Sequence, residues 1–166
     1  MEQPLSSYNF TFIGGPKSIY IFETRFGAEY EIKFKPSGYL VDNPAFEDFA
    51  FEMVIVLTAN PYTPRLPPVD ALMSATIRAI VADFFKTHER VVIYICDDSD
   101  SKADSCRKLF DRWFGRYKKE IFVKLNVPLG VDEDGMAYSV ELISRFDNPH
   151  FMAIYESFKR TVSGEK

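Results

Sequence analysis

The first third of the chain alternates between hydrophobic and polar residues with a period of two. The clearest case is Glu29–Lys35, in which an aromatic or aliphatic residue follows each charged one. This alternation predicts an antiparallel strand with one buried and one solvated face. Ile19–Thr24 is rich in β-branched and aromatic residues and predicts the strand before it, and Gly27 between the two favours a tight reversal.

Two further segments extend this hairpin into a meander. Tyr8–Ile13 alternates in part and suits a short edge strand, which Gly14-Gly15-Pro16 ends. Phe49–Leu57 predicts the last strand of the meander, and its segment Val54–Leu57 is apolar enough to be buried on both faces. Asp42–Asp48, which precedes this strand, has the composition of a loop.

The second half of the chain changes to helical spacing. Asp70 is a good N-cap for a helix with a wide apolar face that extends to about Thr87. Val91–Ile95 is continuously apolar, as a central parallel strand would be. The remaining predicted elements are a second helix at Lys102 to Phe114, strands at Ile121–Val127 and Ala137–Ser144, a loop at Pro128–Gly135, a proline-rich connector at Asn60–Pro68, and a final helix that starts at Asn148-Pro149.

These elements predict an α+β fold. An N-terminal antiparallel meander is followed by helix, strand, helix, strand, strand and helix, which gives a mixed sheet with helices on at least one face. We expect a single domain over residues 1–166, with an ordered core of about residues 8–160. A chain of 166 residues that is 46% hydrophobic and 16% aromatic can bury a substantial core without disulfides or metals.

An acidic turn follows the central strand directly and consists of Asp97, Asp98, Ser99 and Asp100. These four residues form the candidate ligand-binding site, because strand ends in α/β sheets commonly carry one. Carboxylates that lie close together bind a cation or retain a proton, and oxygen ligands suit Mg²⁺ or Mn²⁺. Asp97 and Asp100 are the candidate metal ligands, with Glu23 as a third carboxylate. The same residue types cap helices and form turns, and this second interpretation is the stronger one.

The composition narrows the class of protein. The net charge of -4 argues against a general nucleic-acid binder. Cys96 and Cys106 are the only cysteines, match no zinc-site spacing and fit reduced thiols in a cytoplasmic protein. The first residues lack the basic and apolar regions of a signal peptide, and no apolar run approaches the roughly 20 residues that cross a bilayer. We therefore expect a cytoplasmic protein that does not enter the membrane.

Three phrases carry a resemblance to a known family: FKPSGYL (Phe34–Leu40), YICDDSDSKADSCRKLFDRWF (Tyr94–Phe114) and RFDNPHFMAIYESF (Arg145–Phe158). Through them the chain resembles, over nearly its whole length, a family of small uncharacterised bacterial proteins found mainly in Bacteroidetes. This resemblance implies no activity and no catalytic residues.

The order of three antiparallel strands, helix, strand, helix and strand is also similar to that of ribonuclease H-like folds. A carboxylate commonly follows the fourth strand of those folds, where Asp97 or Asp98 stands here, but fold similarity alone does not establish function.

These observations favour a non-enzymatic module that binds a protein partner or assembles with itself and needs no cofactor. Aromatic residues are enriched in interface cores, and Tyr39, Phe46, Phe49 and Tyr62 lie in or near loop segments of this chain. The alternative role of these four residues is to close the ends of the sheet. The competing hypothesis for function is a divalent-metal-dependent phosphoesterase or nuclease that uses Mg²⁺ or Mn²⁺ and the carboxylates at the end of the central strand.

Overall fold

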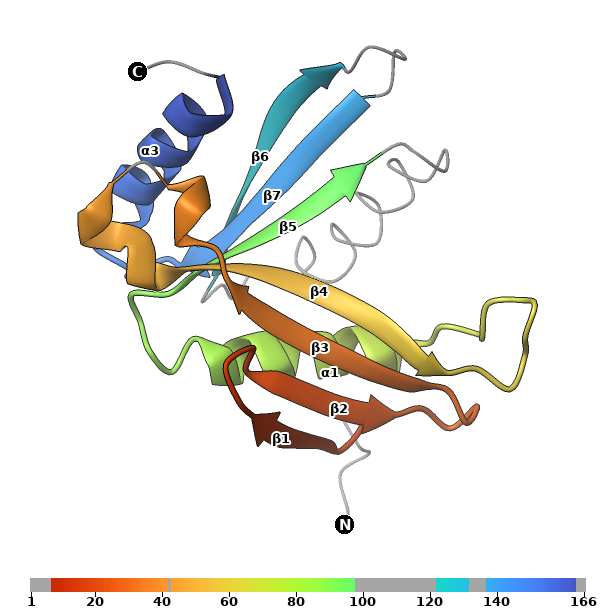
Figure 1. The fold of residues 1–166 in the computed structure, drawn as a ribbon. Helices are drawn as coiled ribbons and strands as arrows, with labels where there is room; N and C mark the ends of the chain where they lie inside the picture. Colours follow the sequence, from red (N-terminus) through yellow and green to blue (C-terminus); the bar gives the residue numbers. More distant parts are fainter. Residues whose placement is uncertain (1–6, 42, 98–121, 132–136, 164–166) are drawn as a thin grey trace.

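The computed structural model describes residues 7–41, 43–97, 122–131 and 137–163. In this part of the chain, seven strands form one mixed sheet in the order β1-β2-β3-β4-β5-β7-β6 (Figure 1). The strands are β1 (Phe10–Gly14), β2 (Ile19–Glu23), β3 (Glu29–Pro36), β4 (Ala50–Ala59), β5 (Val91–Asp97), β6 (Phe122–Val131) and β7 (Ala137–Arg145). The described helices are α1 (Ala71–Phe84), α3 (Phe151–Ser163) and two short 3-10 helices, η1 (Gly38–Leu40) and η2 (Pro44–Phe49). The α+β class and the N-terminal antiparallel meander are confirmed.

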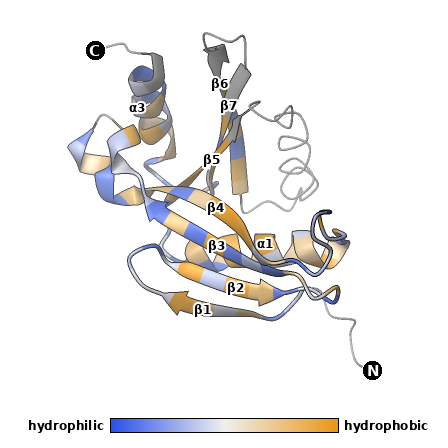
Figure 2. Ribbon diagram, turned by 45° about the vertical axis from the view of Figure 1, so that its right-hand side comes forward, coloured by the Kyte–Doolittle hydropathy of each residue, from blue (hydrophilic) through white to orange (hydrophobic). Residues whose placement is uncertain are grey.

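The meander β1–β4 follows the predicted alternation. Tyr30, Ile32 and Phe34 of β3 are buried, and the charged residues between them are half-buried on the other face. Figure 2 shows hydrophilic and hydrophobic residues alternating along β3. The edge strand predicted at Tyr8–Ile13 is present as β1, which pairs antiparallel with β2. One face of the meander therefore carries the core, as the sequence predicted.

Helix α1 covers that core face. Asp70 is its N-cap, because its carboxylate accepts a hydrogen bond of 2.9 Å from the backbone N–H of Met73. The same carboxylate accepts a hydrogen bond from the Tyr8 hydroxyl at 2.5 Å and pairs with the Arg25 guanidinium at 3.1 Å. Asp70 thus ties the N-terminal segment and the β2–β3 turn to the start of the helix. The helix ends at Phe84, earlier than predicted, where the fully buried Phe85 turns into the core.

Strand β5 joins two halves of the sheet. It pairs parallel with β4 only between Ala50–Glu52 and Val91–Ile93, whereas it pairs antiparallel with β7 along its whole length. Beyond the three parallel pairs, β4 and β5 diverge (Figure 1). We call β1–β4 with α1 the meander wing, β5, β7 and β6 with α3 the C-terminal wing, and the three parallel pairs the seam. The predicted central parallel strand is therefore parallel on one side only.

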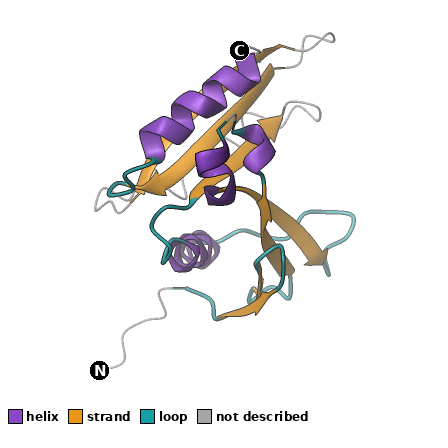
Figure 3. Cartoon of the chain, turned by 60° about the vertical axis from the view of Figure 1, so that its left-hand side comes forward, coloured by secondary structure: helices purple, strands orange, loops and turns teal. Residues whose placement is uncertain are grey.

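The two helices cover opposite faces of the sheet. Val92 belongs to the core cluster under α1, whereas its neighbours Val91 and Ile93 belong to the cluster under α3. Successive residues of a strand point to opposite faces, so α1 lies on one face of the meander wing and α3 on the other face of the C-terminal wing. Figure 3 shows this arrangement along the length of α3, with α1 seen nearly end-on.

Two segments predicted as loops are regular. Asp42–Asp48 overlaps η2, which starts because Asn43 accepts a hydrogen bond from the Ala45 N–H and Pro44 has a fixed φ. Pro128 does not end β6, which continues through a register shift between Pro128 and Gly130. β6 lies at the edge of the sheet, where a proline needs no partner for its missing N–H. The loop prediction at Asp42–Asp48 is therefore wrong over η2, and that at Pro128–Gly135 is wrong as far as Val131, because residues 132–135 lie outside the described part of the chain.

The final helix starts later than predicted. The Asn148 side chain accepts a hydrogen bond from the His150 N–H, which makes a turn before the helix, and α3 itself begins at Phe151. The helix predicted at Lys102 to Phe114 lies outside the described residues. None of the helices in the described ranges has the length and apolar character that crossing a membrane requires.

Candidate functional site

The predicted acidic turn begins where β5 ends. Asp97 is the last residue of β5, and its backbone is in register with Tyr138 of β7. Asp98, Ser99 and Asp100 lie outside the described residues, so the ligand site and its Mg²⁺ or Mn²⁺ ligands stay a prediction. A melting series with each ion tests it in the native chain and in Asp97→Asn, because an ion that binds only the folded state raises the melting temperature.

Glu23 does not lie beside this turn. It ends β2, and both β3 and β4 separate β2 from β5. Neighbouring strands are about 4.8 Å apart, so three steps across the sheet place Glu23 roughly 14 Å from the line of β5. Since metal ligands lie within about 2–2.6 Å of one ion, this separation argues against Glu23 as a third carboxylate beside Asp97. Among the described residues, no three His, Cys, Asp or Glu side chains are grouped so that they could hold an ion.

Glu141 of β7 is the only fully buried carboxylate in the described part of the chain, with 1% of its surface exposed. The Asn126 side-chain amide donates to its Oε1 at 2.8 Å, and the Lys124 ammonium lies 3.9 Å from its Oε2. Tyr94 is in register with it on β5, and burial raises the pKa of the Tyr94 hydroxyl. A buried carboxylate needs such partners. Sequence reasoning missed it, although it is the single acid in the otherwise uncharged segment Ala137–Ser144.

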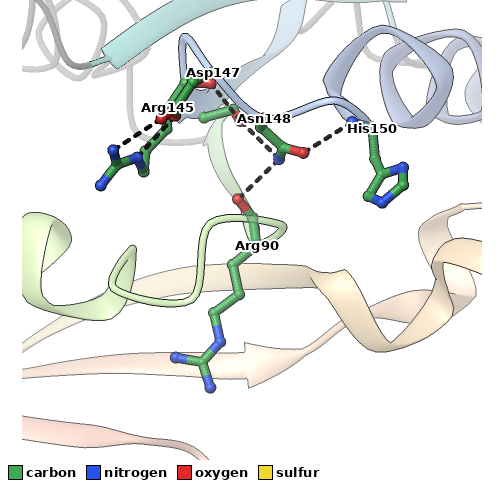
Figure 4. Close-up of polar contacts among 6 residues, drawn as sticks. Arg90, Arg145, Asp147, Asn148 and His150 are labelled. Carbon is green, nitrogen blue, oxygen red and sulfur yellow. Dashed lines mark hydrogen bonds and ion pairs between the residues drawn. The ribbon is translucent and has the colours of Figure 1, made fainter.

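A second polar network joins the end of β7 to the start of β5 (Figure 4). The buried Asn148 donates to the Ser144 hydroxyl at 2.9 Å and to the Arg90 carbonyl at 3.4 Å, and accepts from the His150 N–H at 2.9 Å. Every polar atom of the Asn148 amide group therefore has a partner within the protein. This network holds the C-terminal wing together and presents no reactive group to a ligand.

The Arg90 side chain is also structural. Its guanidinium lies 4.3 Å from the centre of the Phe84 ring and 5.4 Å from that of Phe51, and it donates to the Phe84 carbonyl at 3.1 Å. Cations over aromatic rings are attracted by the negative ring face. Arg145 likewise pairs with Asp147 through two contacts of 2.9 and 3.0 Å within the β7–α3 turn.

The aromatic residues near loops divide into two pairs. The Phe46 and Phe49 rings pack against the His150 ring, with centroids 5.4 and 5.8 Å away, and border the core cluster under α3. These two residues close one end of the sheet, which was the alternative role considered for them. Tyr39 and Tyr62 are 74% and 40% exposed.

The face of the meander wing opposite α1 is not covered by any described helix or strand (Figures 1 and 3). We call it the open face, and it comprises Ile19 and Ile21 of β2, Glu29, Glu31, Lys33 and Lys35 of β3, and Glu52, Val54 and Val56 of β4. The strand register places Ile21, Glu31 and Val56 in one row and pairs Lys33 with Val54 in the next, and Ile19 precedes the paired residues of β2 by one position.

The open face is unusually apolar for a solvated sheet surface. Solvated faces of antiparallel sheets normally carry polar residues, but here two isoleucines and two valines flank the charged row of β3. All four are half-buried, and neither core cluster of the described residues includes any of them. Val54–Leu57 was predicted to be buried on both faces; Ile55 and Leu57 pack toward α1, whereas Val54 and Val56 lie on the open face. Within the described part of the chain, no element forms a second layer over Val54 and Val56.

The comparison with known families identifies the C-terminal part of the chain. Residues 70–160 match the sequence profile of DUF6169, a family of unknown function. This chain belongs to the DUF6169 family. The match includes two of the three phrases on which a resemblance was based, Tyr94–Phe114 and Arg145–Phe158, and excludes Phe34–Leu40. It begins at the N-cap of α1, so the meander strands that form the open face precede the matched region. No curated protein and no solved structure matched the chain.

Proposed function

We propose that this protein is a non-enzymatic interaction module whose contact surface is the open face of the meander wing. The observation that carries the proposal is the set of four β-branched apolar residues, Ile19, Ile21, Val54 and Val56, on a sheet face that no described element covers. Exposed apolar surface next to polar residues is typical of protein–protein contact sites, and here two apolar strips border the charged row of β3. The charged residues of β3 supply the polar part that such a surface needs for specificity.

The first test uses two neighbouring residues that point to opposite faces of β4. Val54→Asp should weaken partner binding but leave the melting temperature almost unchanged, because Val54 lies outside both core clusters. Met53→Asp is the control and should unfold the protein, because Met53 is fully buried under α1 and an unpaired buried charge is costly. Equal loss of melting temperature in both variants would assign Val54 to the core and contradict the proposal.

The second test locates the contact surface with an amine-reactive crosslinker in an extract of the source cells. Lys33 and Lys35 lie on the open face, whereas Lys86 follows α1 on the other face and its side chain is 80% exposed. Crosslinks that result from random collisions with other proteins should form mostly at Lys86, because it is the more exposed lysine. Crosslinks to an identified protein that start at Lys33 or Lys35, and are lost in Val54→Asp, support the proposal. Crosslinks that start only at Lys86 or at Lys159 of α3 would place the contact surface elsewhere.

A further inference from the structure

The charged row of β3 has a polarity. Its outward residues run from two acids, Glu29 and Glu31, to two bases, Lys33 and Lys35. Within one copy, Glu31 and Lys33 lie 3.5 Å apart, and their side chains are 25% and 26% exposed. The row is therefore neutral as a whole but acidic at one end and basic at the other. A second copy, turned by 180° about an axis that lies in the interface and is perpendicular to the strands, presents a complementary row.

This polarity selects one way of stacking two copies. In a two-fold interface, residue i contacts residue j while j contacts i. A two-fold axis parallel to the strands would place acids on acids and bases on bases. An axis perpendicular to the strands reverses their direction, so Glu31 faces Lys33 of the second copy and Glu29 faces Lys35. Like charges across an interface are strongly unfavourable, and the antiparallel arrangement alone avoids them.

The apolar residues on both sides of β3 fit the same axis. Tyr20, Ile32 and Ile55 are in register across β2, β3 and β4 and mark the level at which the axis crosses all three strands. One residue above and below that level lie Ile19 and Ile21 on β2 and, on β4, Val54 and Val56. The perpendicular axis stacks β2 on β2 and β4 on β4, so each of these apolar residues meets an apolar residue of the second copy.

We infer that the protein forms a two-fold homodimer in which the open faces of two copies pack against each other with antiparallel β3 strands. Sheets that pack face to face lie about 10 Å apart with their strands roughly 30° from alignment, which leaves room for the Glu and Lys side chains to meet between them. The inference rests on the proposed function and names a second copy as the occupant of the open face. The apolar residues of β2 and β4 supply the buried surface of the interface, and the charged row of β3 fixes the relative orientation of the two copies.

Sedimentation equilibrium on the full chain over a range of concentrations tests the dimer. The native chain should dimerise reversibly, and Lys33→Glu and Glu31→Lys should each weaken dimerisation roughly tenfold or more, because each places like charges opposite one another. The decisive sample is an equal mixture of these two variants. In the antiparallel arrangement each acid at these positions then faces a base in the other chain, so dimers with one copy of each variant should form about as tightly as native dimers.

The matched control is Lys159→Glu in α3. Lys159 also lies 3.5 Å from an exposed glutamate, Glu156, but it belongs to α3 of the C-terminal wing and not to the open face. This variant should dimerise like the native chain. Circular dichroism of each variant alone should give the spectrum of the native chain, which checks that the variant is folded. Recovery on mixing cannot come from a repaired fold, because each chain keeps its own substitution.

Each other outcome overturns the inference in a distinct way. A native chain that stays monomeric at all concentrations rules out the homodimer but not the proposed function, which the crosslinks from Lys33 and Lys35 to a different protein would still support. A native dimer that both variants form equally well places the dimer interface elsewhere. Variants that are monomeric alone and also when mixed rule out the antiparallel pairing of β3.

Discussion

At the scale of single residues, a hydrogen bond between Tyr20 and Asp83 connects β2 to the end of α1. The Tyr20 hydroxyl donates to the Asp83 carboxylate at 2.6 Å, and the Lys86 ammonium lies 2.7 Å from the other carboxylate oxygen. The bonds from Lys86 and from Tyr20 hold the pKa of Asp83 below its ordinary value, whereas burial and the carboxylate raise the pKa of Tyr20. Ionised Asp83 is therefore the form that stabilises the fold.

Asp83→Asn should lower the free energy of unfolding by about 1 kcal/mol at pH 7. Because the folded pKa of Asp83 is lowered, its contribution is complete above the unfolded value of about 3.9 and is lost as the pH falls through the folded pKa. The difference between native and variant should therefore shrink toward pH 2. Urea unfolding at both pH values measures it, and a difference that stays constant would show that the ionised carboxylate contributes nothing.

Asn148→Ala should cost about 2 kcal/mol of unfolding free energy, because it leaves the buried Ser144 hydroxyl and the Arg90 carbonyl without this donor. Asp147→Ala is the control next to it, because Asp147 is exposed and bonds only Arg145 among the contacts described above. Urea unfolding of the two variants compares them. Similar small losses would mean that water replaces the Asn148 amide.

The sequence identified Asn148 but not the network around it. Asn-Pro before an apolar helical pattern is a local signal, and the structure places a turn before α3 at this position. Arg90 precedes Asn148 by 58 residues and meets it only because β5 and β7 pair. No pattern within one element contains that information. The acidic turn was as visible as Asn148 in the sequence, and its role stays a prediction.

At the scale of elements, η2 starts at its own Asn43 cap and also packs against His150 and the core under α3. Phe46→Ala should lower the free energy of unfolding by about 2 kcal/mol, because the ring packs on His150 and on the core under α3. Tyr39→Ala in η1 is the control and should have little effect, because Tyr39 is largely exposed. Thermal unfolding of both variants tests this. Weaker dimerisation of a Phe46→Ala variant with native stability would instead place Phe46 in an interface.

Elements with a strong internal period were predicted well. The alternation of Glu29–Lys35 identified β3 and both of its faces, and the N-cap of α1 was found at Asp70. The two loop predictions failed for different reasons. The helix signals of η2, Asn43 and Pro44, are local but short, whereas Pro128 is tolerated in β6 because β6 lies at the edge of the sheet. The burial of Val54 and Val56 was predicted from their apolar character, but the sequence could not tell which face α1 would cover.

At the scale of the whole molecule, the seam is the narrowest connection between the two wings. Ala50 lies there, fully buried beside Val91, in the cluster that α3 covers. Ala50→Leu should cost about 1–3 kcal/mol by overpacking the seam, whereas Ala82→Leu on the exposed side of α1 should cost little. Urea unfolding measures both, and native-state hydrogen exchange shows whether the amides of one wing lose protection before those of the other.

The hydrophobic pattern of the sequence predicts the strands of the two wings better than it predicts the order in which they pair. Val91–Ile95 was predicted to be a central parallel strand, and its parallel neighbour is β4, the last meander strand. The order β5-β7-β6 was not predicted, because apolar strands of similar length can pair in several orders with equal burial. The open face is visible only once α1 and α3 are placed on opposite sides of the sheet.

The seam also has a consequence for the protein while the ribosome is making it. The strands of the meander are neighbours in sequence and can pair as soon as Ala59 has emerged, but the partner of the β4 edge, Val91–Ile93, comes later. Translation adds roughly 5–20 residues per second, so the nascent meander spends seconds with one edge unpaired. An unpaired strand edge is a template for pairing with another chain. Until Val91–Ile93 emerge, Ala50–Glu52 of β4 are therefore open to pairing with another chain.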